Sequence, residues 1–129
     1  MKRQIMVVDD EVGMLKIITL MLERVGYTVL GANNALTALE LLDTNTPDLI
    51  IADVMMPNID GFELCHRIRA HPRFGHVPVI ILSARTDAAA VQRAFDVGAN
   101  AYMPKPTLHR DLVSKVSFLL DNESGNVGS

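Results

Sequence analysis

Five side chains that could bind phosphate or a metal ion lie at or just after the end of a short apolar run: Asp9, Asp10, Asp53, Ser83 and Lys105. A charged group in such a place is costly unless it is paired or binds something. Three carboxylates that lie close together repel one another, so one of them stays protonated or a cation joins them. What these side chains can do depends on whether the fold brings them to one place.

A hard divalent cation such as Mg²⁺ fits an all-oxygen site of this kind and keeps several of its waters. Its open positions accept phosphate oxygens, while Lys105 supplies positive charge and Ser83 a hydroxyl donor. Such a set suits phosphoryl transfer, in which positioning and charge neutralisation supply most of the catalysis. A carboxylate can itself be the nucleophile and form an aspartyl phosphate. Asp53 is the best candidate because it ends a central strand alone, which leaves Asp10 as the direct metal ligand.

The apolar runs predict the strands that carry these side chains. They are short, rich in β-branched residues and continuous rather than alternating, which is typical of strands buried on both faces of a parallel sheet. The predicted strands are residues 5–8, 27–30, 49–52, 77–82 and 101–103.

Segments with apolar residues at helical spacing alternate with these strands. The predicted helices are residues 12–25, 35–43, 61–70, 87–97 and 109–121. Gly26 and Gly98 are placed to end the first and the fourth of these helices, and Asp87 is placed to cap the start of the fourth.

Five strands and five helices in strict alternation predict a doubly wound α/β fold of the flavodoxin-like type, with a parallel sheet in the order 2-1-3-4-5. In such sheets the ligand crevice lies outside the carboxyl ends of the strands. The candidate side chains should therefore converge on one edge. We expect one domain over residues 1–121 and a disordered polar tail over residues 122–129.

Length and charge narrow the range of functions. The chain has 129 residues, which suits a single core, and a net charge of -3, which gives no support for nucleic-acid or membrane binding. No apolar stretch approaches the length of a membrane span, and the start of the chain does not read as a signal peptide. A single cysteine, Cys65, is compatible with a reducing compartment. We therefore expect a cytoplasmic protein.

Four segments together resemble the bacterial two-component receiver domain, the fold of chemotaxis response regulators: "VVDDE", "DLIIADVMMPNIDGFEL", "VPVIILSA" and "GANAYMPKP". Their order and spacing match that family, with 30 residues from Asp53 to Ser83 and 22 more to Lys105. The resemblance covers residues 4 to about 121. Each segment alone is a weak signal, whereas the combination is highly specific.

The resemblance implies that Asp53 takes a phosphoryl group from a histidine kinase or a phosphotransfer protein. It also implies an Mg²⁺ ion held by Asp10, by the Asp53 side chain and by the backbone carbonyl of Met55, with Asp9 helping through a water. The domain would then act as a signalling phosphoacceptor that catalyses its own phosphorylation and slow dephosphorylation, and not as an enzyme in the usual sense.

The same resemblance assigns a switch. Ser83 and Lys105 would hold two phosphoryl oxygens, and the ring of Tyr102 would turn inward when Ser83 is drawn to the phosphate. The surface formed by the last two helices and the last strand would then change its preference for a downstream protein target or for an output domain outside this chain. The bond between Lys105 and Pro106 matches one that is cis in the family.

A few positions depart from the common pattern or vary within it. Pro104 removes a backbone donor from the last strand, which predicts that this strand lies at the edge of the sheet. Met55 and Arg85 occupy positions that tune the lifetime of the phosphoryl group in the family, so we expect an altered lifetime.

Other readings remain open from the residues. Asp9 and Asp10 could be solvated acids that cap a helix. An aspartyl-phosphate hydrolase of the haloacid dehalogenase type would carry a second acid at the position of Met55. A receiver-like binding module that is never phosphorylated would lack part of the acidic pair, the acceptor or the lysine. A dinucleotide-binding domain is disfavoured because no G-x-G-x-x-G segment follows the first strand.

Overall fold

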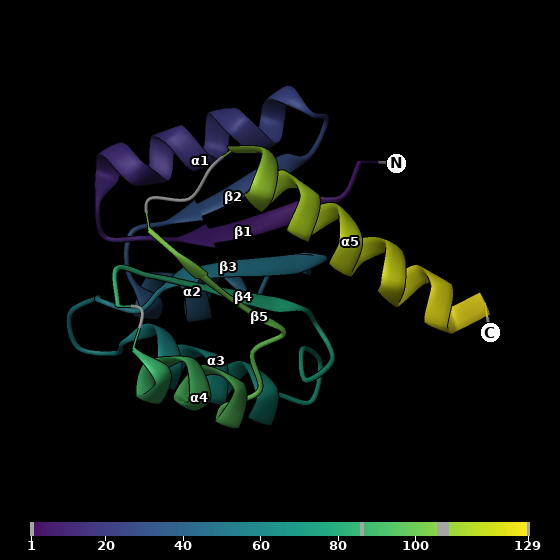
Figure 1. Cartoon of the computed structure of the whole chain (residues 1–129). Helices are drawn as coiled ribbons and strands as arrows, with labels where there is room; N and C mark the ends of the chain where they lie inside the picture. Colours follow the sequence, from purple (N-terminus) through teal and green to yellow (C-terminus); the bar gives the residue numbers. More distant parts are fainter. Residues whose placement is uncertain (1, 86, 106–108, 129) are drawn as a thin grey trace.

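The structure is a computed structural model that describes residues 2–85, 87–105 and 109–128. Within these residues, five parallel strands form one sheet in the order β2-β1-β3-β4-β5, and five helices cover its two faces (Figure 1). The strands are β1 (Gln4–Val8), β2 (Thr28–Ala32), β3 (Leu49–Asp53), β4 (Val79–Ser83) and β5 (Ala101–Pro104). The helices are α1 (Val12–Arg24), α2 (Ala35–Leu41), α3 (Gly61–Ala70), α4 (Ala88–Asp96) and α5 (His109–Gly128). The predicted fold class and strand order are confirmed.

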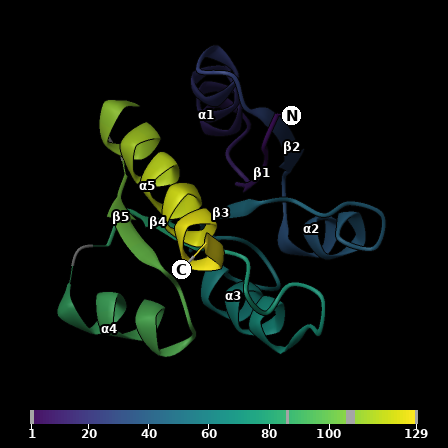
Figure 2. The ribbon, with the colours of Figure 1, turned by 90° about the vertical axis from the view of Figure 1, so that its right-hand side faces the viewer.

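The sheet separates two apolar cores because successive side chains of a strand point to opposite faces. In β1, Met6 and Val8 pack into the core beneath α2, α3 and α4, whereas Ile5 and Val7 pack into the core beneath α1 and α5. Figure 2, turned by 90° from Figure 1, shows α1 and α5 on one side of the sheet and α2, α3 and α4 on the other. Each fully buried aliphatic side chain of this kind stabilises the fold by about 1.5–3 kcal/mol. This double-sided burial explains why the strands are continuously apolar.

The helix starts and ends follow local signals in the sequence. The side chain of Asp60 caps α3 by accepting the amide of Glu63 at 2.8 Å, and Asp87 caps α4 by accepting the amide of Ala90 at 3.2 Å. Gly98 follows α4 with a φ of 98°, a conformation that glycine adopts without a steric penalty. The predicted cap at Asp87 and the predicted helix end at Gly98 are both confirmed.

β5 lies at the edge of the sheet, as Pro104 predicted. Two predicted strands are shifted: β2 ends at Ala32 rather than at residue 30, and β4 begins at Val79 rather than at residue 77. Strand ends are set by pairing with the neighbouring strand, and this pairing cannot be predicted from a single run of apolar residues. The shift of β4 places Ser83 inside the strand as its last residue.

The final helix is longer than predicted. The sequence pattern ended this helix at residue 121, whereas in the structure the backbone of α5 stays helical to Gly128. The disorder expected for residues 122–129 stays a prediction, and residue 129 lies outside the described residues. A helix can continue past its last core contact because its hydrogen bonds are internal, and Leu120 is the last α5 residue in the described core. The end of α5 extends beyond the sheet (Figure 1). A domain boundary at residue 121 stays a prediction.

None of the helices in the described part of the chain is both long and apolar enough to cross a membrane.

Candidate functional site

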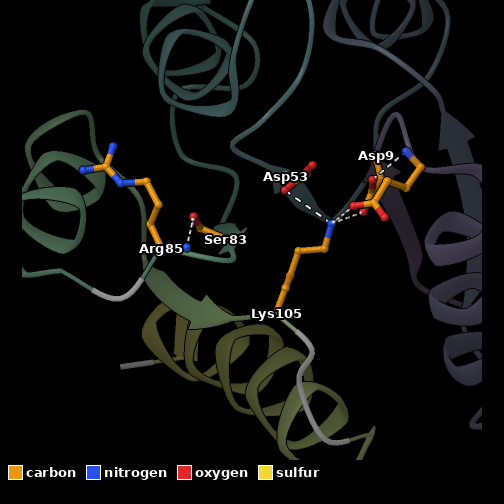
Figure 3. A network of polar contacts seen from close by, with 6 residues as sticks. Asp9, Asp53, Ser83, Arg85 and Lys105 are labelled. Carbon is orange, nitrogen blue, oxygen red and sulfur yellow. Dashed lines mark hydrogen bonds and ion pairs between the residues drawn. The ribbon is translucent and has the colours of Figure 1, made fainter.

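The candidate side chains meet at the carboxyl edge of the sheet. Asp9 and Asp10 directly follow β1, and Lys105 directly follows β5. Asp53 and Ser83 are the last residues of β3 and β4. Parallel strands all present their carboxyl ends on the same side, so residues that are distant in the sequence lie together there (Figure 3). The predicted convergence on one edge is therefore found in the structure.

Three of these side chains form a cluster of carboxylates. Oxygens of Asp9, Asp10 and Asp53 lie within 4.8 Å of one another. Asp9 and Asp53 are buried, with exposed fractions of 1% and 3%, whereas Asp10 is exposed. The Oδ1 atom of Asp9 accepts the backbone amide of Glu11 at 2.9 Å, which fixes that carboxylate at the start of α1. Asp9 is thus not a solvated acid at the surface.

Lys105 is the cation of this cluster. Its Nζ atom lies 2.9 Å from Oδ2 of Asp9, 3.2 Å from Oε1 of Glu11 and 3.4 Å from Oδ1 of Asp53. Figure 3 shows its side chain reaching from the end of β5 toward Asp53 and Asp9. The side chain is only 9% exposed, so little solvent screens these contacts. The contact with Glu11 was missed, although this acid follows the aspartate pair directly in the sequence.

The electrostatics of the cluster favour a bound cation. The pKa of Asp53 is raised from 3.8 to about 6, chiefly by burial and in addition by the charges of Asp9 and Asp10, against the opposing effect of Lys105. The pKa of Lys105 is raised as well: burial acts to lower it, but the hydrogen bonds to Asp9 and Glu11 and the charges of Asp53 and Asp9 together outweigh burial. One ammonium therefore does not fully neutralise the carboxylates.

The donor set fits Mg²⁺. Mg²⁺ prefers oxygen ligands, and it is usually bound through one or two carboxylates while it keeps several waters. The cluster supplies three carboxylates whose oxygens lie within 4.8 Å of one another, and the carboxylate of Asp10 is open to solvent. A cavity of about 240 Å³ beside it is lined by Glu11, Met14, Asp53, Met55, Ala84 and Lys105. This cavity leaves room for a small anionic group next to Asp53.

A glycine sets the path of the chain beside Asp53. The amide of Gly61 donates to the carbonyl of Val54 at 3.0 Å, which brings the start of α3 against the end of β3. A Cβ atom at this position would lie 2.4 Å from the backbone oxygen of Asp53. Only a residue without a side chain allows this approach. Gly61 therefore helps to place the carboxylate of Asp53, a role that the sequence analysis missed.

Ser83 and Tyr102 both contact the residue Arg85. The Oγ atom of Ser83, which is fully buried, accepts the amide of Arg85 at 3.0 Å. The hydroxyl of Tyr102 donates to the carbonyl of Arg85, and its ring is half-buried against the core beneath α2, α3 and α4. The structure thus brings the two proposed switch residues to one loop. The cis bond expected after Lys105 involves Pro106, which lies outside the described residues.

Known proteins are similar to this chain over most of its length. The family model "Response regulator receiver domain" matches residues 5–117. The chain is 35% identical over 120 residues to the alkaline phosphatase synthesis transcriptional regulatory protein PhoP of Bacillus subtilis, covering 93% of this chain and 49% of that protein. The chain spans about half the length of the curated relatives it matches.

Solved structures are similar over nearly the whole chain. One is the signal receiver domain of a signal transduction histidine kinase from Syntrophus aciditrophicus, with a TM-score of 0.87 and 33% identity over 93% of this chain and 91% of that chain. Another is a CheY-like response regulator receiver domain protein from Methanospirillum hungatei, with a TM-score of 0.91 and 25% identity over 98% of this chain and 99% of that chain.

Proposed function

Since the chain belongs to the family of response regulator receiver domains, we propose that Asp53 accepts a phosphoryl group from a histidine kinase or a phosphotransfer protein. The observation that carries this proposal is the contact of 3.4 Å between Lys105 Nζ and Asp53 Oδ1 inside a cluster of three aspartates. The buried carboxylate of Asp53 is placed to react with a phosphoryl group. The nearby ammonium of Lys105 is placed to neutralise the negative charge of the phosphorylated product.

The transfer is a displacement at phosphorus. A carboxylate oxygen of Asp53 attacks the phosphorus of a phosphohistidine on the donor. The bond between phosphorus and nitrogen breaks, and its electron pair returns to the donor imidazole. The product is an acyl phosphate on Asp53, which water later cleaves to restore the carboxylate and release phosphate. Only the ionised carboxylate attacks, and a pKa of about 6 leaves Asp53 mostly ionised at neutral pH.

The surrounding side chains bind the phosphoryl oxygens. Lys105 holds one oxygen with its ammonium, and Ser83 donates its hydroxyl to another. Mg²⁺ would be held by Asp10, by Asp53 and by the carbonyl of Met55, with Asp9 acting through a water. When bound, this ion neutralises charge on the transferred group.

The output is a change of protein contacts. We propose that Tyr102 responds to Ser83 and that the surface formed by α4, β5 and α5 then binds a downstream protein target or an output domain outside this chain. A receiver of this kind catalyses its own phosphorylation and slow dephosphorylation only. The cytoplasmic location and the absence of direct nucleic-acid and membrane binding also belong to this proposal.

A direct test is the Mg²⁺-dependent mass gain of one phosphoryl group from acetyl phosphate. We expect the wild-type chain to gain this mass, Asp53→Asn to lose the gain, and removal of Mg²⁺ with EDTA to abolish it. Asp43→Asn, at an exposed aspartate outside the cluster, is the matched control and should behave as wild type. If Asp53→Asn gains the mass as readily as wild type, Asp53 is not the acceptor.

The same samples separate the alternatives. A binding module that is never phosphorylated gains no mass in any variant. An aspartyl-phosphate hydrolase releases many equivalents of phosphate per chain within minutes. A receiver gives about one phosphoryl group per chain and slow release, and this is the result we expect.

A further inference from the structure

Two hydrogen bonds hold the backbone of Arg85 at the edge of the site. Its amide donates to Oγ of Ser83 at 3.0 Å, and its carbonyl accepts the hydroxyl of Tyr102. Two side chains from β4 and β5 therefore determine where the Arg85 backbone lies. A shift of either side chain must move Arg85 or break one of these hydrogen bonds.

The side chain of Arg85 continues this chain of contacts toward α4. Its Nε and Nη2 atoms donate to the two carboxylate oxygens of Asp87 at 3.0 and 2.9 Å. This two-point contact fixes the orientation of the planar guanidinium against the carboxylate. Figure 3 shows the Arg85 side chain directed toward α4 and away from Lys105.

Asp87 is also the cap of α4. The oxygen that accepts Nη2 of Arg85, Oδ2, accepts the amide of Ala90 at 3.2 Å as well. The guanidinium of Arg85 and the first turn of α4 thus share one oxygen atom. A movement of Arg85 shifts the carboxylate that caps this helix or removes the cation that lies beside it.

We infer that Arg85 is a positioning residue that couples the Ser83 hydroxyl to the first turn of α4. Ser83 cannot turn its Oγ atom toward a new partner without disturbing the amide of Arg85, and the guanidinium passes this disturbance to Asp87. The inference deepens the proposed function, because the phosphoryl group on Asp53 would be the new partner of Ser83. It also predicts a coupling that exists without any phosphoryl group.

A second arginine pair provides a matched comparison. Arg67 and Glu63 on α3 form an ion pair of 3.0 Å with side chains 48% and 46% exposed, close to the 51% and 49% of Arg85 and Asp87. Among the described residues, neither Arg67 nor Glu63 has a hydrogen bond to Ser83, and the Glu63 carboxylate does not cap a helix. Loss of Arg67 therefore controls for the general effect of removing an exposed arginine.

The test is a double-mutant cycle read by amide hydrogen exchange at Ala90. The variants are wild type, Ser83→Ala, Arg85→Gln and the double variant, with Arg67→Gln in place of Arg85→Gln as the control series. We expect Ser83→Ala to change exchange at Ala90 by about twofold to fivefold when Arg85 is present. The change should vanish in the Arg85→Gln background and persist in the Arg67→Gln background.

The amide of Glu63 serves as an internal reference, because Asp60 caps α3 in the same way at 2.8 Å and lies outside the coupled contacts. Its exchange should stay constant across the four variants of the Arg85 cycle, which separates coupling from a general loss of stability. In the Arg67→Gln series Glu63 loses its ion-pair partner, so there its exchange is compared only with and without Ser83→Ala. A purely structural role of Arg85 would give additive effects at Ala90, and equal effects of Ser83→Ala in both backgrounds would overturn the inference.

A second measurement does not depend on the single serine variant. Wild type and Arg85→Gln are treated with acetyl phosphate, and the mass gain is recorded together with exchange at Ala90. Because Arg85 can alter the lifetime of the phosphoryl group, exchange is compared at equal mass gain, and there we expect only wild type to change at Ala90. If exchange at Ala90 changes equally in both chains, the coupling is overturned. If the wild-type chain gains no mass, that result counts against the proposed function, and the double-mutant cycle without phosphorylation then tests the coupling.

Discussion

Lys105 Nζ lies 3.4 Å from Asp53 Oδ1, although the two residues are 52 positions apart in the sequence. The contact only partly neutralises Asp53, because the pKa of this carboxyl is still raised to about 6 by burial and by its acidic neighbours. The site therefore keeps an unbalanced negative charge that disfavours folding at neutral pH. This imbalance is the physical basis of the first two predictions.

Asp53→Asn should stabilise the metal-free protein at neutral pH. The folded protein binds a proton at Asp53 up to about pH 6, whereas the unfolded chain releases it near pH 3.8, so the stability of the wild type falls as the pH rises through this window. The amide that replaces the carboxyl in this variant does not titrate and avoids this loss. We expect a gain of about 1–3 kcal/mol above pH 6 and little gain below pH 4, measured by urea unfolding in EDTA. Asp43→Asn should show no such pH dependence.

Lys105→Met should destabilise the fold, and more so at high pH. Removing one partner of a buried ion pair costs about 3–5 kcal/mol when the other charge stays buried. Without Lys105 the pKa of Asp53 rises further, so at pH 5 this carboxyl is protonated and needs no cation, whereas at pH 8 it is ionised. We expect a larger loss in urea unfolding at pH 8 than at pH 5, and partial recovery with Mg²⁺. An equal loss at both pH values would contradict the prediction, and Lys16→Met on the surface of α1 is the control.

Gly61→Ala should harm both stability and phosphorylation. A Cβ atom there would lie 2.4 Å from the backbone oxygen of Asp53, so the start of α3 must move away from β3. We expect a loss of about 2–4 kcal/mol in urea unfolding and a slower mass gain from acetyl phosphate. Gly13→Ala is the matched control, because a Cβ atom at that position in α1 meets no atom within 4 Å. It should be neutral or stabilise by about 0.5–1 kcal/mol.

Asn100→Ala should lower stability without affecting the site. The Oδ1 atom of Asn100 accepts the amide of Val79 at 2.9 Å and Nη2 of Arg69 at 2.7 Å, at the edge of the sheet opposite Asp53. The buried amide of Val79 then lacks an acceptor, which costs about 1–3 kcal/mol. Phosphorylation of the folded variant should match wild type. Asn100→Asp keeps an acceptor and should be near neutral, so a large loss in that variant would argue against this explanation.

The sequence was sufficient to predict the layers and the edge at which the site forms. The apolar runs in β1 and β3 end at Asp9 and Asp53, and parallel strands present such ends together. The same reasoning predicts that Ser83 and Lys105 lie on that edge. It did not predict which groups touch, because the reach of a side chain depends on how the strands twist and on which loop packs beside them.

Arg69 shows what pattern alone could not provide. It sits on α3 among other basic residues, yet its guanidinium donates to the carbonyls of Gly98 and Val77 and to Asn100, which joins α3 to the starts of β4 and β5. Nothing in its spacing distinguishes it from Arg67, whose partner is an exposed glutamate one turn away.

By itself, the sequence determined the order of the elements, because local spacing and continuous apolar runs specify helices and buried strands. Only the tertiary structure decided that Lys105 binds Asp9, Glu11 and Asp53 at once and that Arg85 joins Ser83 to the cap of α4. The physical reason is range: patterning acts within a few residues, whereas these contacts depend on distances between segments that only the packed sheet brings together.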